Sequence, residues 1–201
     1  MKFTVADLLD QLSTNDSVET AVIAKILKLT NKSDKQSLDI AIEALSKIGV
    51  LTRGEGDVVA RTRNDEFIDA RLRCSSKGFC FAIRDDGGDD IYNRDHQLNH
   101  AWNGDRVLVR ITREGGRRRS PEGGVQCILE RSTTSLLGQV ERRDDQLFAV
   151  PLDDRMHTTI RLPNEAEEYL SSEDPTAVVE VLVDRYPIAQ HPALGQVVRS
   201  L

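Results

Sequence analysis

The sequence predicts an α+β chain of three modules, an N-terminal winged helix-turn-helix followed by two tandem β-barrels of the OB-fold type. Apolar residues recur at helical spacing through the first third of the chain. From Ala70 onward, short alternating strands are separated by turns rich in Gly and Asp, which is the pattern of a small barrel. This strand pattern then occurs a second time further along the chain. We therefore expect three domains, at residues 1–66, 67–131 and 132–201.

Three helices are expected in the first domain, each with a polar residue suited to cap its N-terminus. Thr4 precedes the first apolar stripe, and Ser17 precedes the second. Ser33 with Gln36 forms a capping box for the third helix, which Gly49 ends. Three short helices in this order are typical of a helix-turn-helix domain.

Two β-prone runs, 50–53 and 58–61, flank a Gly-Glu-Gly-Asp turn and predict the hairpin, or wing, that completes this domain. Domains of this kind often bind DNA through the third helix. The outward charges of that helix are mixed, however: Lys35, Asp39, Glu43 and Lys47. The pattern therefore favours a docking or auxiliary module, with a sequence-specific DNA reader as the alternative.

Both barrels are expected to have five strands with a short helix between the third and the fourth, the order of an OB-fold. In the first barrel the strands are expected at 70–73, 78–83, 90–94, 105–111 and 124–129, and the helix at 95–102. In the second barrel they are expected at 138–141, 146–151, 159–162, 176–183 and 195–200, and the helix at 164–170.

Composition excludes several classes of protein. No apolar run approaches the ~18 residues of a membrane span, and the N-terminus lacks the apolar core of a secretory signal. The three cysteines, Cys74, Cys80 and Cys127, are odd in number and show no CxxC spacing. A disulfide framework or a zinc site is therefore not expected, and a reducing cytoplasm is the expected location.

The net charge of −6 is unevenly distributed. Residues 67–131 carry 12 Lys and Arg against 10 Asp and Glu, whereas residues 132–201 carry 6 against 12. Eleven of the twelve cations in the middle third are arginines, the side chain best suited to phosphate forks and base stacking. This asymmetry indicates a polyanionic partner for the middle third alone.

The run Lys77-Gly78-Phe79-Cys80-Phe81 carries the most specific chemical signal. Because strand side chains alternate between faces, Phe79 and Phe81 share one face and Cys80 takes the other. If Cys80 points inward, two rings lie on the outer surface, and Tyr92 of the next strand extends the patch. Exposed rings beside cations suit single-stranded nucleic acid, because bases stack on the rings. Alternation alone equally allows both phenylalanines to be core residues.

Several cations are candidates to neutralise phosphates beside these rings. They are Lys77, Arg71, Arg73 and Arg94, together with Arg117, Arg118 and Arg119 on the glycine-hinged loop between the fourth and fifth strands. That loop flanks the oligonucleotide groove in many OB-folds. The alternative for the loop is a flexible, solubilising segment.

The ring motif, together with Asp90-Ile91-Tyr92, resembles the RNA-binding motifs of cold-shock domains. The stretch from Asn103 through Gly-Asp-Arg-Val to Arg110 resembles the first cold-shock domain of the ribonuclease II / ribonuclease R family. The segment Leu137-Gly138-Gln139-Val140 fits the passage into a second such domain, and the winged helix fits the ribonuclease R branch. The resemblance covers nearly the whole chain.

The resemblance implies the single-stranded RNA-binding region of a 3′→5′ exoribonuclease, a hydrolase that degrades RNA. The family's magnesium-binding aspartates follow an Asp-x5-Asp-x-Asp-Asp pattern that these 201 residues lack. We therefore expect no catalytic residue, metal ligand or cofactor here, and magnesium only in a separate catalytic domain; whether the chain counts as an enzyme depends on that domain. The alternatives are a stand-alone RNA-binding regulator or RNA chaperone, and a winged-helix DNA-binding regulator.

Overall fold

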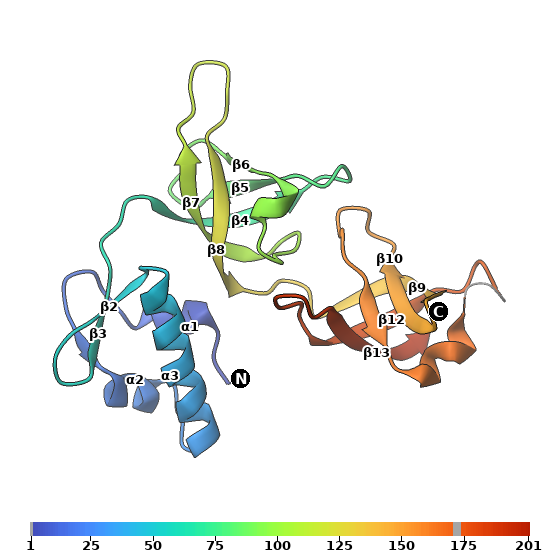
Figure 1. Cartoon of the computed structure of the whole chain (residues 1–201), viewed down its shortest axis with the longest axis horizontal. Helices are drawn as coiled ribbons and strands as arrows, with labels where there is room; N and C mark the ends of the chain where they lie inside the picture. The colour runs from blue at the N-terminus through green and yellow to red at the C-terminus, as the bar shows by residue number, and fades with distance from the viewer. Residues whose placement is uncertain (1, 171–173) are drawn as a thin grey trace.

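The computed structural model describes residues 2–170 and 174–201, which form three sheets in three parts of the chain (Figure 1). The first is a three-stranded sheet in the order β1-β3-β2, and the other two are closed five-stranded barrels. The expected fold class is confirmed. No helix among the described residues is long and apolar enough to cross a membrane.

The N-terminal part combines three helices with the three-stranded sheet. In chain order its elements are α1 (Val5–Asp10), β1 (Val18–Glu19), α2 (Thr20–Ile26), α3 (Lys32–Lys47), β2 (Leu51–Arg53) and β3 (Val58–Arg61). Thr4 caps α1 in a full capping box with Asp7, as its sequence predicts. The antiparallel pair β2–β3 forms the expected wing.

Two of the expected helix caps are wrong. Ser17 does not cap α2, because the next residue, Val18, is extended and pairs with Val59 of β3. The third helix begins earlier than Ser33, because the side chain of Asn31 accepts a first-turn backbone N–H at 2.8 Å. The α3 difference arises because Asn31 and Ser33 compete for one cap, whereas α2 begins without a side-chain cap, after Glu19.

The first barrel has the strand order β4-β5-β6-β8-β7. Its strands are β4 (Phe67–Cys74), β5 (Cys80–Arg84), β6 (Ile91–Asn93), β7 (Arg106–Arg113) and β8 (Glu122–Glu130). The expected helix at 95–102 shortens to a single 3₁₀ turn, η1 (Asp95–Gln97). Asn99 and His100 have φ values of 47° and 65°, which no α-helix accommodates.

The second barrel repeats this topology in the order β10-β11-β13-β12-β9. Its elements are β9 (Ser135–Arg143), β10 (Gln146–Pro151), β11 (Ile160–Leu162), η2 (Asn164–Tyr169), β12 (Val179–Arg185) and β13 (Ala193–Ser200). Each barrel closes through one parallel pair, β6 with β8 and β11 with β13. The expected internal repeat is therefore confirmed at the level of strand order.

The three parts share buried residues. Leu108 and Leu129 of the first barrel belong to the same apolar cluster as the helices α1 and α3. Trp102 follows η1, yet it is buried with the core residues of the second barrel. Two of the apolar clusters therefore extend from one part of the chain into the next.

Candidate nucleic-acid interface

Three aromatic rings lie together on the outer face of β5 and β6. Phe81 of β5 is paired in register with Tyr92 of β6, so their side chains share one face of the sheet. The ring centroids of Phe81 and Tyr92 are 5.6 Å apart, as are those of Phe79 and Tyr92. Phe79 and Phe81 meet edge to face at 6.0 Å. We call Phe79, Phe81 and Tyr92 the ring platform.

The ring platform faces outward. Cys80 and Ala82 are fully buried in the barrel, whereas the three rings are only half-buried. The expectation that Cys80 points inward is confirmed, and the alternative of two core phenylalanines is wrong. The barrel is narrow enough that small residues fill the inward positions of β5, which leaves the larger rings outside.

The expectation of no disulfide, which followed from the cysteine count, is wrong. Cys74 of β4 and Cys80 of β5 are directly opposite in the antiparallel register, and their sulfur atoms are bonded. The antiparallel pairing of β4 with β5 brings the two cysteines together. Their spacing of six residues does not predict the bond unless the register of this hairpin is known. Cys127 is a free thiol, and its pKa is raised to about 12 by burial.

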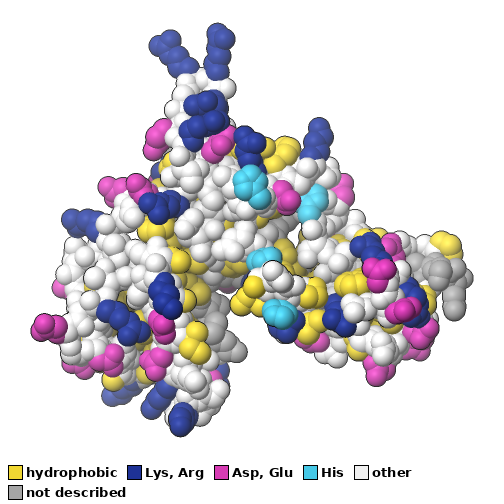
Figure 2. All heavy atoms as spheres, viewed as in Figure 1, with side chains coloured by type: hydrophobic (Ala, Val, Ile, Leu, Met, Phe, Trp, Pro, Cys, Tyr) yellow, Lys and Arg dark blue, Asp and Glu magenta, His cyan; other side chains and the backbone are white. Residues whose placement is uncertain are grey.

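A groove of about 650 Å³ lies between Phe81 of the ring platform and the hairpin that joins β7 to β8. We call residues 114–121 of that hairpin the arginine arm; Arg117, Arg118 and Arg119 lie at its end and are exposed. Figure 2 shows the arm projecting from the body with dark blue side chains at its end. The groove is lined by Phe81 and Arg73 on one side and by the three arginines on the other.

The remaining predicted cations lie at different distances from this groove. Arg73 is paired with Phe81 in register and extends the row of the ring platform onto β4. The guanidinium of Arg94 lies 6.0 Å from the centre of the Tyr92 ring, and exposed Lys77 lies on the hairpin beside Phe79. Arg71 does not line the groove, and its side chain instead donates to the Gly104 carbonyl at 2.9 Å.

Carboxylates also border the interface. The sequence pattern predicts the Asp pairs only as turn residues and does not predict them at the interface. Asp89 and Asp90 line the groove opposite the arginine arm. Glu122 accepts from Arg113 at 2.6 Å and lies 3.5 Å from Arg94, so it partly neutralises the cation over Tyr92. The sequence pattern does not predict Glu122 at this interface, because only the strand register places it beside Tyr92.

The second barrel has no such ring cluster among its described residues. Phe148 of β10 occupies the position equivalent to Phe81, but its neighbours in register are Glu141 and Arg161. One ring between two charged side chains offers a single stacking position. The candidate interface is therefore confined to the first barrel.

Two protein families match separate parts of the chain. The family described as "Cyanobacterial RNase R, N-terminal domain" matches residues 6–62, and the "Ribonuclease B OB domain" matches residues 70–128. The first match covers most of the helical part, and the second covers the barrel that carries the ring platform.

Relatives match nearly the whole chain. The "Acetazolamide conferring resistance protein zam" of Synechocystis sp. is 45% identical over 202 residues, which is 100% of this chain and 25% of that protein. Ribonuclease R of Aquifex aeolicus is 26% identical over 89% of this chain and 24% of its own length. The chain therefore spans about a quarter of the length of these relatives.

A solved structure shares the fold. Mycoplasma genitalium RNase R, in complex with ribose-methylated single-stranded RNA, matches with a TM-score of 0.54 and 18% identity. The match covers 67% of this chain and 21% of that one.

Proposed function

Because the chain belongs to the ribonuclease II / ribonuclease R family, we propose that its first barrel binds single-stranded RNA on the ring platform. The RNA bases stack on Phe79, Phe81 and Tyr92, and the phosphates face the cations of the groove. Each stacked base contributes roughly 1–3 kcal/mol, and stacking tolerates any base, so binding is broad in sequence.

The observation that carries this proposal is the clustering of three half-buried rings on a surface that also bears arginines. Monomeric proteins rarely leave adjacent aromatic rings on their surface without a ligand or partner. Arg73, Arg94 and the arginine arm provide the positive charge that a polynucleotide needs next to such rings. A related RNase R has been solved with single-stranded RNA, which supports the same ligand here.

The proposal extends to the whole protein. In a longer protein of the relatives' length, the ring platform guides the bound RNA to a catalytic domain outside these 201 residues. That domain is a magnesium-dependent 3′→5′ exoribonuclease. Among the described residues, no group of three or more His, Cys, Asp or Glu side chains is placed to hold a metal ion.

Substitution of both phenylalanines tests the proposal. The double variant F79A/F81A should bind a fluorescent oligouridine at least about 30-fold more weakly in an anisotropy titration, since it loses two stacking positions. The matched control is F148A, which removes the equivalent ring of the second barrel and should leave the affinity unchanged. Circular dichroism confirms that both variants are folded.

Competition separates the alternatives. If single-stranded RNA binds to the ring platform, an excess of duplex DNA should displace it poorly. Displacement by duplex DNA at equal concentration, together with full affinity of F79A/F81A, would instead assign the chain to a winged-helix DNA-binding regulator. An exoribonuclease and an RNA chaperone would both keep single-stranded RNA bound in this competition. They differ in whether the full-length protein degrades the bound RNA.

A further inference from the structure

The disulfide lies at the base of the hairpin that carries part of the ring platform. Cys74 ends β4 and Cys80 begins β5, so the bond closes the loop formed by residues 75–79. Phe79 is the last residue of this loop, and Phe81 follows Cys80 directly. Any loosening of the hairpin base therefore moves Phe79 relative to Phe81 and Tyr92.

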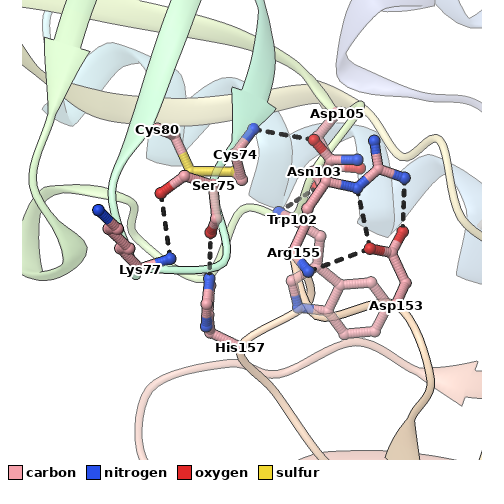
Figure 3. The surroundings of a disulfide bond; sticks show 10 residues. All are labelled: Cys74, Ser75, Lys77, Cys80, Trp102, Asn103, Asp105, Asp153, Arg155 and His157. Carbon is pink, nitrogen blue, oxygen red and sulfur yellow. Dashed lines mark hydrogen bonds and ion pairs between the residues drawn. A yellow bond between two sulfur atoms is a disulfide. The ribbon is translucent and has the colours of Figure 1, made fainter.

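Besides the pairing of β4 with β5, several hydrogen bonds hold the loop 75–79 and its base (Figure 3). The backbone N–H of Cys74 donates to Asn103 Oδ1 at 2.9 Å, and that of Ser75 donates to the Phe79 carbonyl at 2.9 Å. On the second barrel, His157 Nε2 lies 2.6 Å from the Ser75 carbonyl. Gly78 at the turn has a φ of +93°, a conformation that favours glycine, and a Cβ at this position would meet no atom within 4 Å.

We propose that the Cys74–Cys80 bond is a redox switch that controls how firmly the ring platform holds single-stranded RNA. In the oxidised chain the hairpin is closed and Phe79 is fixed against Tyr92. In the reduced chain the loop 75–79 gains conformational freedom, which must be lost again when a base stacks on Phe79. The RNA readout rests on the function proposed above, whereas the loosening of the hairpin does not.

The Cys74 side of the bond borders a cleft. Cys74 lines a cleft of about 180 Å³ between the two barrels, and it is 7% exposed, whereas Cys80 is 0% exposed. A small dithiol attacks the Cys74 sulfur as a thiolate, and its second thiol then resolves the mixed disulfide. Two electrons pass to the protein, each cysteine sulfur takes up one proton, and the reductant leaves as a cyclic disulfide.

The third cysteine does not take part. Cys127 lies on β8, and its raised pKa keeps it a protonated thiol at neutral pH. Because the thiolate is the species that reacts in disulfide exchange, the burial that raises this pKa slows exchange at Cys127. The redox response is therefore a property of the Cys74–Cys80 pair.

The experiment compares the full chain before and after treatment with dithiothreitol. Mass spectrometry after alkylation in denaturant counts the free thiols, with one expected before reduction and three after it. Hydrogen exchange of the amides in residues 75–79 should accelerate about tenfold on reduction. The affinity for oligouridine should fall about five-fold. The variant C127S should respond in the same way, and C74A/C80A should behave as reduced in either condition.

Three results would overturn the switch: three free thiols in the air-oxidised protein, a bond that resists dithiothreitol, or amide exchange that is equal in both redox states. Exchange that accelerates without a change in affinity would likewise overturn control of RNA binding. If the oxidised chain binds no RNA at all, the function proposed above fails, while the hydrogen-exchange result still decides whether the hairpin responds to reduction.

Discussion

Asp105 shows how one buried charge connects the two barrels. Its carboxylate is 0% exposed and accepts from the backbone N–H of Trp102 at 2.8 Å and that of Ser132 at 2.9 Å. It also accepts from the Arg131 guanidinium at 3.0 Å. Burial raises the pKa of Asp105, while these three donors lower it. The donors thus offset much of the cost of burying the carboxylate.

The variant D105A should therefore be strongly destabilised. Removal of the carboxylate leaves the partly buried guanidinium of Arg131 and two backbone N–H groups without their acceptor, at a cost of about 3–5 kcal/mol. Urea denaturation measures the free energy of unfolding. The matched control D153A removes an exposed carboxylate paired with Arg155 and should cost about 0–1 kcal/mol. Equal losses in the two variants would contradict this account of Asp105.

Among the elements, the hairpin between β7 and β8 is the one that extends furthest beyond its barrel. Its turn is closed by two backbone bonds between Gly116 and Arg119, so the arginine arm is an ordered hairpin. The alternative of a flexible, solubilising segment stays open beside phosphate binding. Among the described residues, none of the three arginines forms an ion pair, so each is available to a polyanion.

The variant R117A/R118A/R119A should weaken the salt dependence of RNA binding. Each phosphate contact to a single strand contributes about 0.7 to the slope of log affinity against log salt, so the loss of three contacts lowers the slope by about 2. Anisotropy titrations over a range of salt concentrations measure it. R155A, which removes an arginine already paired with Asp153, should keep the original slope. A slope that stays constant in the triple variant would show that the arm does not contact phosphate.

At the scale of the whole molecule, an aromatic contact joins the two barrels. Trp102 from the first barrel lies 5.2 Å from Tyr186 of the second, measured between ring centroids. The guanidinium of Arg131, in the connection between the barrels, lies 5.3 Å from the Trp102 ring and 4.4 Å from the Tyr186 ring. A cation between two rings stabilises this junction in addition to the area that it buries.

The variant W102A should release the barrels from one another. We expect an increase in the radius of gyration measured by small-angle X-ray scattering, since the contact that holds the barrels together is lost. Y186F is the matched control, because it keeps the ring and removes only the hydroxyl that donates to the Thr133 carbonyl at 2.7 Å. An unchanged radius of gyration in W102A would show that other contacts are sufficient to hold the barrels.

The sequence by itself determined the three helices and the wing, the two barrels, and the outward position that Phe79 shares with Phe81. These features follow from periodicity, because the side-chain alternation of a strand and the apolar spacing of a helix are local properties of the chain. Cap residues and the extent of the short helix at 95–102 were determined only in part. Neighbouring polar residues compete for one cap, and the tendency of Asn and His to adopt a positive φ does not fix which of them does so.

Only the tertiary structure decided which side chains come together across paired strands and between the barrels. It joined Cys74 to Cys80, placed Asp89 and Asp90 opposite the arginine arm, and buried Trp102 in the second barrel. Each of these depends on strand register or on the packing of one barrel against another. Register and packing are set by the sum of many weak contacts across the whole molecule, so no short stretch of sequence encodes them.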